Sequence, residues 1–159
     1  MKGTKISNIS KRTVASALPS RPLVAVGADD SILHAVTIMA ENNCGSALVL
    51  FAETIIGIVT ERDILIKVVA KAIDPTTIRV DAVMTKQPVC AQHDMSVTHA
   101  LYTMKELGFC HFPVVDANRK PLGVFSLRDA LIEEWVSANN LAEQKRKLQI
   151  HPAPQKVGK

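Results

Sequence analysis

The chain has 159 residues, of which 47% are hydrophobic, and a formal net charge of +4. This length and composition can bury a hydrophobic core, as one domain or as two small interlocked ones. The sequence has no run of about 18 apolar residues and no apolar signal-peptide stretch near its N-terminus, so we expect a cytoplasmic protein rather than a membrane-spanning or secreted one.

Lysine and arginine gather in two stretches, KGTKISNISKR near the beginning and QKRKLQIHPAPQKVGK near the end. Such stretches are more typical of solvated tails than of nucleic-acid surfaces. The chain has one Trp, one Tyr and four Phe, and basic residues do not alternate with aromatic ones. Nucleic-acid binding through the basic ends therefore remains an alternative, and not the leading interpretation.

Cysteine and histidine residues indicate neither a disulfide framework nor a metal site. The three cysteines are odd in number and form no C-x-x-C pair, so we expect them to be small buried apolar residues. A zinc site is not expected either, because no familiar zinc-ligand spacing occurs among Cys90, His93, His99, Cys110 and His111.

The first half of the chain predicts a series of short elements. TVASAL, residues 13–18, predicts a short helix, and residues 23–26 predict a strand. An Asp-containing cap then precedes a helix with apolar residues at Ile32, Ala35, Val36 and Met39. Two β-rich stretches, SALVLF and IIGIVT, predict a strand pair, and a second helix over residues 62–73 is expected to stop at Pro75.

The second half predicts the same elements again. Residues 78–84 predict a short helix in the linker, and residues 89–91 predict a strand. A helix with apolar residues at Val97, Ala100, Leu101 and Met104 follows, then the strands FPVVD and PLGVFS. A last helix starts near residue 128 and is expected to continue to about residue 148, followed by a mobile tail.

These two series are an internal repeat. Residue 24 aligns with residue 89 at an offset of 65, which brings His34 onto His99, where we expect a shared structural or solvent-edge role rather than a metal site. One inserted residue in the turn DANRKP raises the offset to 66, so that Gly57 and Asp63 fall on Gly123 and Asp129. The expected fold class is α/β (α+β), with tandem β-α-β-β-α units related by a pseudo-twofold axis. The predicted boundaries are 1–20, 21–73, 74–85, 86–137 and 138–159.

A small polar motif recurs where a strand meets a helix, as GIVTERD and as GVFSLRD. Free backbone N–H groups and the helix dipole at such a turn favour a phosphate. The hydroxyl and the arginine can donate to phosphate oxygens, while the aspartate suits the hydroxyls of a ribose. A single Thr-x-x-Asp or Ser-x-x-Asp is more often a helix N-cap, but its occurrence at equivalent places in a repeat favours a pair of sites.

The chain resembles the CBS domain pair, also called a Bateman module, of the family named after cystathionine β-synthase. The resemblance rests on the repeat, on VMTKQPV at residues 83–89, on HFPVVD at 111–116 and on the paired motifs. NNCGSALVL followed by GIVTERDI is particularly similar to small stand-alone members. The resemblance to this family covers roughly residues 10–137.

The resemblance implies a regulatory module with two clefts for adenosine-containing ligands: AMP, ADP or ATP, and in some members NAD or S-adenosylmethionine. No cofactor is expected to be required. One cleft would use Thr60, Arg62 and Asp63, and the other Ser126, Arg128 and Asp129. Adenine would lie against the adenine-side residues Val24, Ser46, Ala47, Leu48, Val89, His111, Phe112 and Pro113. Because His111 to Pro113 fits the family pattern better, we expect the Asp129 cleft to bind more tightly.

An enzyme is not expected, because no nucleophile and base are marked together and nothing obvious raises the pKa of the aspartates. The regulated partner would be a separate, unknown protein. Family members pair into a flat dimer, so we expect a homodimer through helices 63–72 and 129–140, with Trp135 near the interface. A ligand-independent dimeric scaffold is the second alternative, beside nucleic-acid binding.

Overall fold

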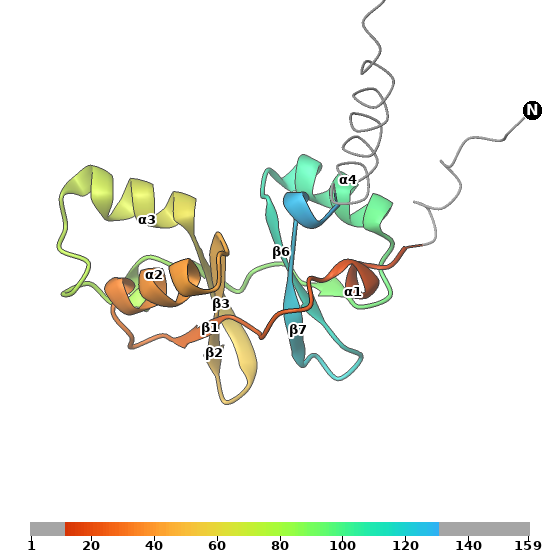
Figure 1. Ribbon diagram of the computed structural model, residues 1–159, viewed down its shortest axis with the longest axis horizontal. Coiled ribbons are helices and arrows are strands. Elements are labelled where there is room, and N and C mark those ends of the chain that lie inside the picture. Colours follow the sequence, from red (N-terminus) through yellow and green to blue (C-terminus); the bar gives the residue numbers. More distant parts are fainter. Residues whose placement is uncertain (1–11, 131–159) are drawn as a thin grey trace, which may run out of the picture.

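The computed structural model describes residues 12–130, which form two similar halves side by side (Figure 1). In the first half, β1 (Ala25–Gly27) leads through α2 (Ile32–Glu41) to the antiparallel strands β2 (Ser46–Phe51) and β3 (Thr54–Thr60). Helix α3 (Glu61–Lys67) follows directly after β3. The second half repeats this order with β5 (Ala91–Gln92), α4 (Val97–Leu107), β6 (His111–Val115) and β7 (Pro121–Ser126), and residues 127–130 are helical.

Each half contains its own small sheet. In the first, β1 pairs in parallel with β2, β2 pairs antiparallel with β3, and β4 (Thr85–Lys86) from the linker adds to β3. In the second, β5, β6 and β7 pair in the same parallel and antiparallel manner. A register shift follows Val49 in β2 and Val114 in β6, which are equivalent positions. The expected mixed α+β fold with two repeated units is therefore confirmed.

Local sequence signals explain where the long helices begin and end. Ser31 caps α2 and Ser96 caps α4, each accepting a hydrogen bond of 3.2 Å from a backbone N–H three residues on. Those N–H groups belong to His34 and His99, whose side chains are exposed, as expected for the solvent edge. Gly108 ends α4 in the left-handed conformation at φ 73°.

Two expected boundaries are corrected by the structure. The leading strands begin two residues later than predicted, so Val24 and Val89 precede β1 and β5. The helix expected over residues 62–73 ends at Lys67 and continues only as the 3₁₀ turn η2 (Val69–Lys71). The two successive β-branched valines at 68 and 69 do not favour a helix, and Ala72 closes the turn at φ 53°, before the proline is reached.

The short helices that precede the two units are exchanged between them. Helix α1 (Val14–Ala17) packs into the core of the second half, where Val14 is fully buried. Its backbone N–H donates to the Met95 carbonyl over 2.8 Å. The linker turn η3 (Val80–Ala82) packs into the first half, and Val80 is fully buried there. The exchange ties the two halves together at both ends.

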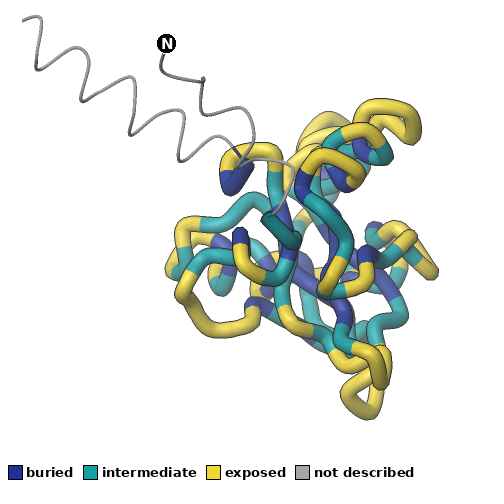
Figure 2. Tube along the Cα trace, turned by 90° about the vertical axis from the view of Figure 1, so that its right-hand side faces the viewer, coloured by how far each residue is buried: buried dark blue, intermediate teal, exposed yellow. Residues whose placement is uncertain are grey.

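Burial is greatest along the central strands β2 and β6, and many exposed positions lie in the turns at the edge of the molecule (Figure 2). The cysteines do not all follow the expectation of burial: Cys44 and Cys90 are half-buried and Cys110 is exposed. Cys110 sits in the loop before β6, outside both cores, which explains the difference. Three predictions concern residues outside the described part of the chain: the interface role of Trp135, the N-terminal segment over residues 1–11, and the C-terminal extension over residues 138–159.

Candidate functional site

The first repeated motif forms a tight capping structure between β3 and α3. The Asp63 carboxylate accepts hydrogen bonds from the Thr60 N–H over 3.1 Å and from the Thr60 hydroxyl over 2.7 Å, both at Oδ2. The Asp63 N–H donates in turn to the Thr60 hydroxyl oxygen over 3.2 Å. The N-cap interpretation of this motif is therefore correct for this turn.

The second motif forms the same structure between β7 and the helix that follows. Asp129 is 4% exposed, and its Oδ2 accepts from the Ser126 N–H over 2.8 Å and from the Ser126 hydroxyl over 2.6 Å. A carboxylate oxygen has more than one lone pair, so capping by one oxygen leaves acceptor capacity for a ligand. Capping and ligand binding are thus compatible roles for these aspartates.

Helix N-terminal N–H groups are less available to a phosphate than the sequence suggests. In the first turn the Glu61 N–H donates to the Gly45 carbonyl over 3.0 Å, beside the two N–H groups already used in the cap. In the second turn the Leu127 N–H donates to the Cys110 carbonyl over 3.3 Å. Most of the N–H groups expected to be free at these turns are therefore engaged, so a phosphate there would depend more on side-chain donors than the sequence suggests.

One difference between the two motifs comes from Lys67. Its ammonium donates to Asp63 Oδ1 over 2.7 Å and to the Val83 carbonyl over 2.6 Å. Asp63 therefore carries an ion pair, partly shielded from water, in addition to its cap. This contact also joins α3 to the linker that leads into the second half.

Two cavities lie between the halves, and each contains one of the aspartates. The larger one, which we call the Asp63 cavity, measures about 580 Å³. It is lined from the first half by β3 and the start of α3, from the linker, and from the second half by the end of α4 and by β6: Ile58, Thr60, Glu61, Arg62, Asp63, Thr85, Gln87, Pro88, Val89, Leu107, Gly108, Phe109, Cys110, His111 and Pro113.

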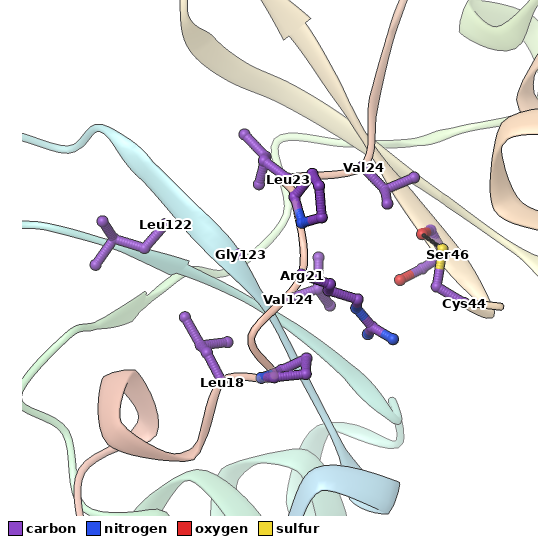
Figure 3. A pocket seen from close by; sticks show the side chains of 11 residues that line it. Leu18, Arg21, Leu23, Val24, Cys44, Ser46, Leu122, Gly123 and Val124 are labelled. Carbon is purple, nitrogen blue, oxygen red and sulfur yellow. Dashed lines mark hydrogen bonds between the residues drawn. The ribbon is translucent and has the colours of Figure 1, made fainter. Parts of the chain in front are cut away.

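The smaller one, which we call the Asp129 cavity, measures about 200 Å³. Its walls come from the turn before β2, from the start of α3 and from the second motif: Arg21, Cys44, Gly45, Ser46, Glu61, Cys110, His111, Val124, Ser126, Leu127, Arg128 and Asp129. A crevice of about 30 Å³ adjoins it and shares Arg21, Cys44, Ser46 and Val124. In this crevice the Arg21 side chain points from the segment between α1 and β1 toward Ser46 and Cys44 (Figure 3).

The structure brings the motif residues to these cavities, and it places five of the eight adenine-side residues at the cavities or at the adjoining crevice. Val24 and Ser46 line the crevice beside the Asp129 cavity, whereas Val89 and Pro113 line the Asp63 cavity. His111 lines both. The remaining three are not among the lining residues and have side chains that are at most 1% exposed, namely Ala47, Leu48 and Phe112.

The pairing of strands with motifs differs from the sequence expectation. The stronger site was expected at Asp129 because Pro113 belongs to the same repeat unit. The strand with Pro113 instead faces the motif of the other unit, so that Pro113 and Asp63 share a cavity. Each cavity combines parts of both units, which removes the reason for expecting tighter binding at Asp129.

His111 lines both cavities, where burial and the neighbouring charges act on its imidazole. Burial lowers the pKa of its imidazole below the ordinary 6.5, and the nearby Arg128 and Arg21 act in the same direction. Glu61 and Asp129 oppose this shift without reversing it. His111 is therefore neutral at pH 7 and presents one donor and one acceptor to the cavities.

Several lining residues were not predicted from the sequence, among them the polar side chains Arg21, Glu61, Gln87 and Cys110. A signal existed for two of them. Glu61 lies inside the quoted motif, and Arg21 aligns at offset 65 with Lys86, which gives each unit a basic residue shortly before its leading strand. The other two are placed only by contacts between the units.

Residues 12–130 contain no group of three or more His, Cys, Asp or Glu residues that could hold a metal ion. Across the same residues, every helix is too short or too polar to cross a bilayer. Burial raises the pKa of the Cys90 thiol, which keeps it protonated and weakly nucleophilic.

Comparison with known proteins gives consistent matches. The CBS domain family model matches residues 14–70 and 80–134. The chain is 34% identical over 118 residues to a 17.7 kDa protein of Acidianus ambivalens, covering 74% of this chain and 70% of that protein. It is also 31% identical over 120 residues to CBS domain-containing protein CBSCBSPB5 of Arabidopsis thaliana, covering 75% of this chain but only 22% of the longer relative.

Solved structures with the same fold include a CBS domain protein from Pyrobaculum aerophilum complexed with AMP. Its TM-score against this chain is 0.69 at 25% sequence identity, and the match covers 79% of this chain and 99% of that protein. The match shows that this chain shares its fold with a solved CBS domain structure.

Proposed function

The chain belongs to the CBS domain family, and from that premise we propose that it is a regulatory module that binds an adenosine-containing ligand and modulates a separate partner protein. The proposed ligands are AMP, ADP and ATP, with NAD and S-adenosylmethionine as further members of the class. Ligand binding, and not catalysis, would be the activity of the chain itself.

The observation that carries this proposal is the composition of the two cavities. Each joins a motif aspartate of one unit to a strand or loop of the other. The Asp63 cavity, at about 580 Å³, falls within the range of about 300 to 1,000 Å³ that is common for small-molecule sites. A ligand bound there would contact both halves and could alter how they sit together. The AMP complex of the Pyrobaculum aerophilum protein supports the choice of ligand class.

Individual roles follow from the chemistry of the lining. We assign the ribose hydroxyls to Asp63 in one cavity and to Asp129 in the other, since a carboxylate accepts hydrogen bonds from paired hydroxyls. Arg62 and Arg128 line the same cavities and would donate to phosphate oxygens. Val89 and Pro113 would supply the apolar contact for adenine in the larger cavity.

A thermal-shift panel tests the proposal. A ligand that binds only the folded protein stabilises it by about 2.7 kcal/mol when present at 100 times its Kd. We expect at least one of AMP, ADP, ATP, NAD and S-adenosylmethionine to raise the melting temperature in a concentration-dependent way, while guanosine monophosphate serves as the control. Failure of all five at millimolar concentration would contradict the proposal.

The ligand-independent dimeric scaffold is the second candidate, favoured by an exposed apolar surface on α3 and η2. Leu65, Ile66 and Val69 are 59%, 55% and 61% exposed, and a largely apolar groove of about 310 Å³ runs between α2 and α3. Apolar surface of this kind favours association with another chain.

Homodimerisation through helices 63–72 and 129–140 is part of both candidate functions, although the second helix lies almost entirely outside the described residues. Sedimentation should give a dimer at micromolar concentration and a weaker one for Leu65→Glu, because the substitution places a charge on the apolar surface. Asn118→Glu, in the exposed turn between β6 and β7 and away from this surface, is the control for the added charge alone. A monomeric parent protein would contradict the dimer. A dimer without any ligand response would favour the scaffold over the nucleotide-binding module.

A further inference from the structure

Glu61 occupies a position common to both cavities. It is the first residue of α3 and lines the Asp63 cavity and the Asp129 cavity alike. Cys110 and His111 also line both, so these three residues form a shared wall between the two spaces. Glu61 contributes the carboxylate of this wall.

The backbone and the surroundings of Glu61 hold it at this wall. Its N–H donates to the Gly45 carbonyl over 3.0 Å, which fixes the start of the helix against the turn before β2. A methyl group built on Gly45 would lie 3.0 Å from Glu61 Oε1 and 3.1 Å from His111 Nε2. The absence of a side chain at Gly45 thus leaves room for the carboxylate and the imidazole at the same spot.

Few positive charges around the Asp63 cavity offset the charge of the Glu61 carboxylate. Arg62 is the one arginine or lysine among the described lining residues, and Lys67 is already bonded to Asp63 Oδ1 over 2.7 Å. Once that ion pair is set aside, the lining presents one guanidinium against one carboxylate, that of Glu61. His111 adds no positive charge at pH 7, since burial lowers its pKa. In the Asp129 cavity, Glu61 similarly faces Arg21 and Arg128.

We propose that Glu61 is a selectivity residue for ligand charge: its carboxylate on the shared wall disfavours polyphosphate groups and biases both cavities toward a nucleoside monophosphate over the triphosphate. This inference rests on the proposed nucleotide binding. Like charges in one cavity repel, and the repulsion grows with the number of phosphates. The effect is greatest in the Asp63 cavity, where a single arginine opposes it.

The test compares the parent protein with Glu61→Gln, which preserves the size of the side chain and removes its charge. Calorimetric titrations would use adenosine, AMP and ATP at low ionic strength with EDTA, so that no metal neutralises the phosphates. We expect the ratio of the ATP Kd to the AMP Kd to fall in Glu61→Gln by about two- to fivefold, the size of one exposed charge contact. The adenosine Kd should stay within about twofold, and added salt should reduce the difference.

Glu53→Gln is the matched control. Glu53 is exposed in the turn between β2 and β3, whereas Ser46 and Thr60 pair at the opposite end of this hairpin, about 20 Å away at the usual rise per residue. It should leave the ratio unchanged. An unaltered ATP to AMP ratio in Glu61→Gln, or an equal change for adenosine, would overturn the charge selectivity while leaving nucleotide binding intact. Absence of binding by the parent protein would refute the proposed function, and the selectivity with it. Circular dichroism confirms that both variants are folded.

Discussion

Replacing Asp129 with alanine should lower both the stability of the fold and the affinity of one cavity. The carboxylate is 4% exposed and accepts two short hydrogen bonds from Ser126, at 2.8 Å from the N–H and 2.6 Å from the hydroxyl. The hydroxyl can turn toward another acceptor, but the N–H cannot. Alanine therefore leaves a partly buried backbone donor without its partner.

The expected loss of stability is about 2 kcal/mol. Ser126 still caps the helix in this variant, so the loss comes from the backbone N–H of Ser126, and a buried donor left without its acceptor costs about 1 to 3 kcal/mol. Asp129→Asn retains an acceptor oxygen at the same place and should lose only about half as much. Urea denaturation measures the difference as a shift of the midpoint at constant m-value.

Ligand affinity provides the second measurement. If Asp129 also accepts from a ribose, losing this charged acceptor should weaken the Asp129 cavity by about 1.5 to 3 kcal/mol, or about ten- to over a hundredfold in Kd. Asp63→Ala should do the same to the other cavity, and the double variant should lose both binding events. Calorimetry with AMP and ATP, carried out well below the melting temperature of each variant, separates affinity from stability.

Two results would refute this reasoning. Stability within about 0.5 kcal/mol of the parent would contradict the energetic role of the cap. Unchanged titration curves in the folded double variant would remove the ribose role of the two aspartates. The sequence alone presented the cap and the ligand contact as opposing hypotheses, whereas the structure makes the cap certain and leaves the ligand contact to be tested.

Three further predictions concern other parts of the chain. Burial lowers the pKa of His111, so the unfolded chain binds this proton at a higher pH than the folded protein does. The folded protein therefore loses stability as the pH falls below 6.5, whereas His111 has no such effect at higher pH. His111→Asn should reduce the loss of stability between pH 7.5 and 5.5, measured by thermal unfolding. Gly57→Ala should destabilise the fold by about 1 to 3 kcal/mol, because the new methyl group would collide with the Met84 side chain and approach the Thr85 carbonyl to 3.2 Å. Gly27→Ala is the control, since its methyl group would meet no atom closer than 3.4 Å and should cost less. Urea denaturation measures both variants. Val14→Ala should lower the free energy of unfolding by about 2 kcal/mol, since about 0.8 kcal/mol is lost per buried carbon and a cavity remains. Amide hydrogen exchange should then become faster in α4. Unchanged amide exchange in α4 would contradict the packing of α1 into the second half.

The sequence by itself determined the repeat and nearly all of its elements. The Asp-containing caps expected before α2 and α4, the apolar spacing of these helices, and the paired β-rich stretches are local signals that act within a few residues. They predicted the strand pairs and the long helices, and the two motifs led to both cavities. The errors lay at the first strands and at the end of α3, where short segments carry too little pattern to fix a boundary.

Only the tertiary structure decided how the two units are combined. The two copies have nearly the same local pattern, so nothing within one copy states whether Pro113 will face Asp63 or Asp129. Packing between the halves makes that choice, and it also sends Val14 into the second core and Val80 into the first. Burial of apolar side chains depends on which surfaces meet and not on their separation in sequence. For the same physical reason the shared position of Glu61 becomes visible only when both cavities are formed.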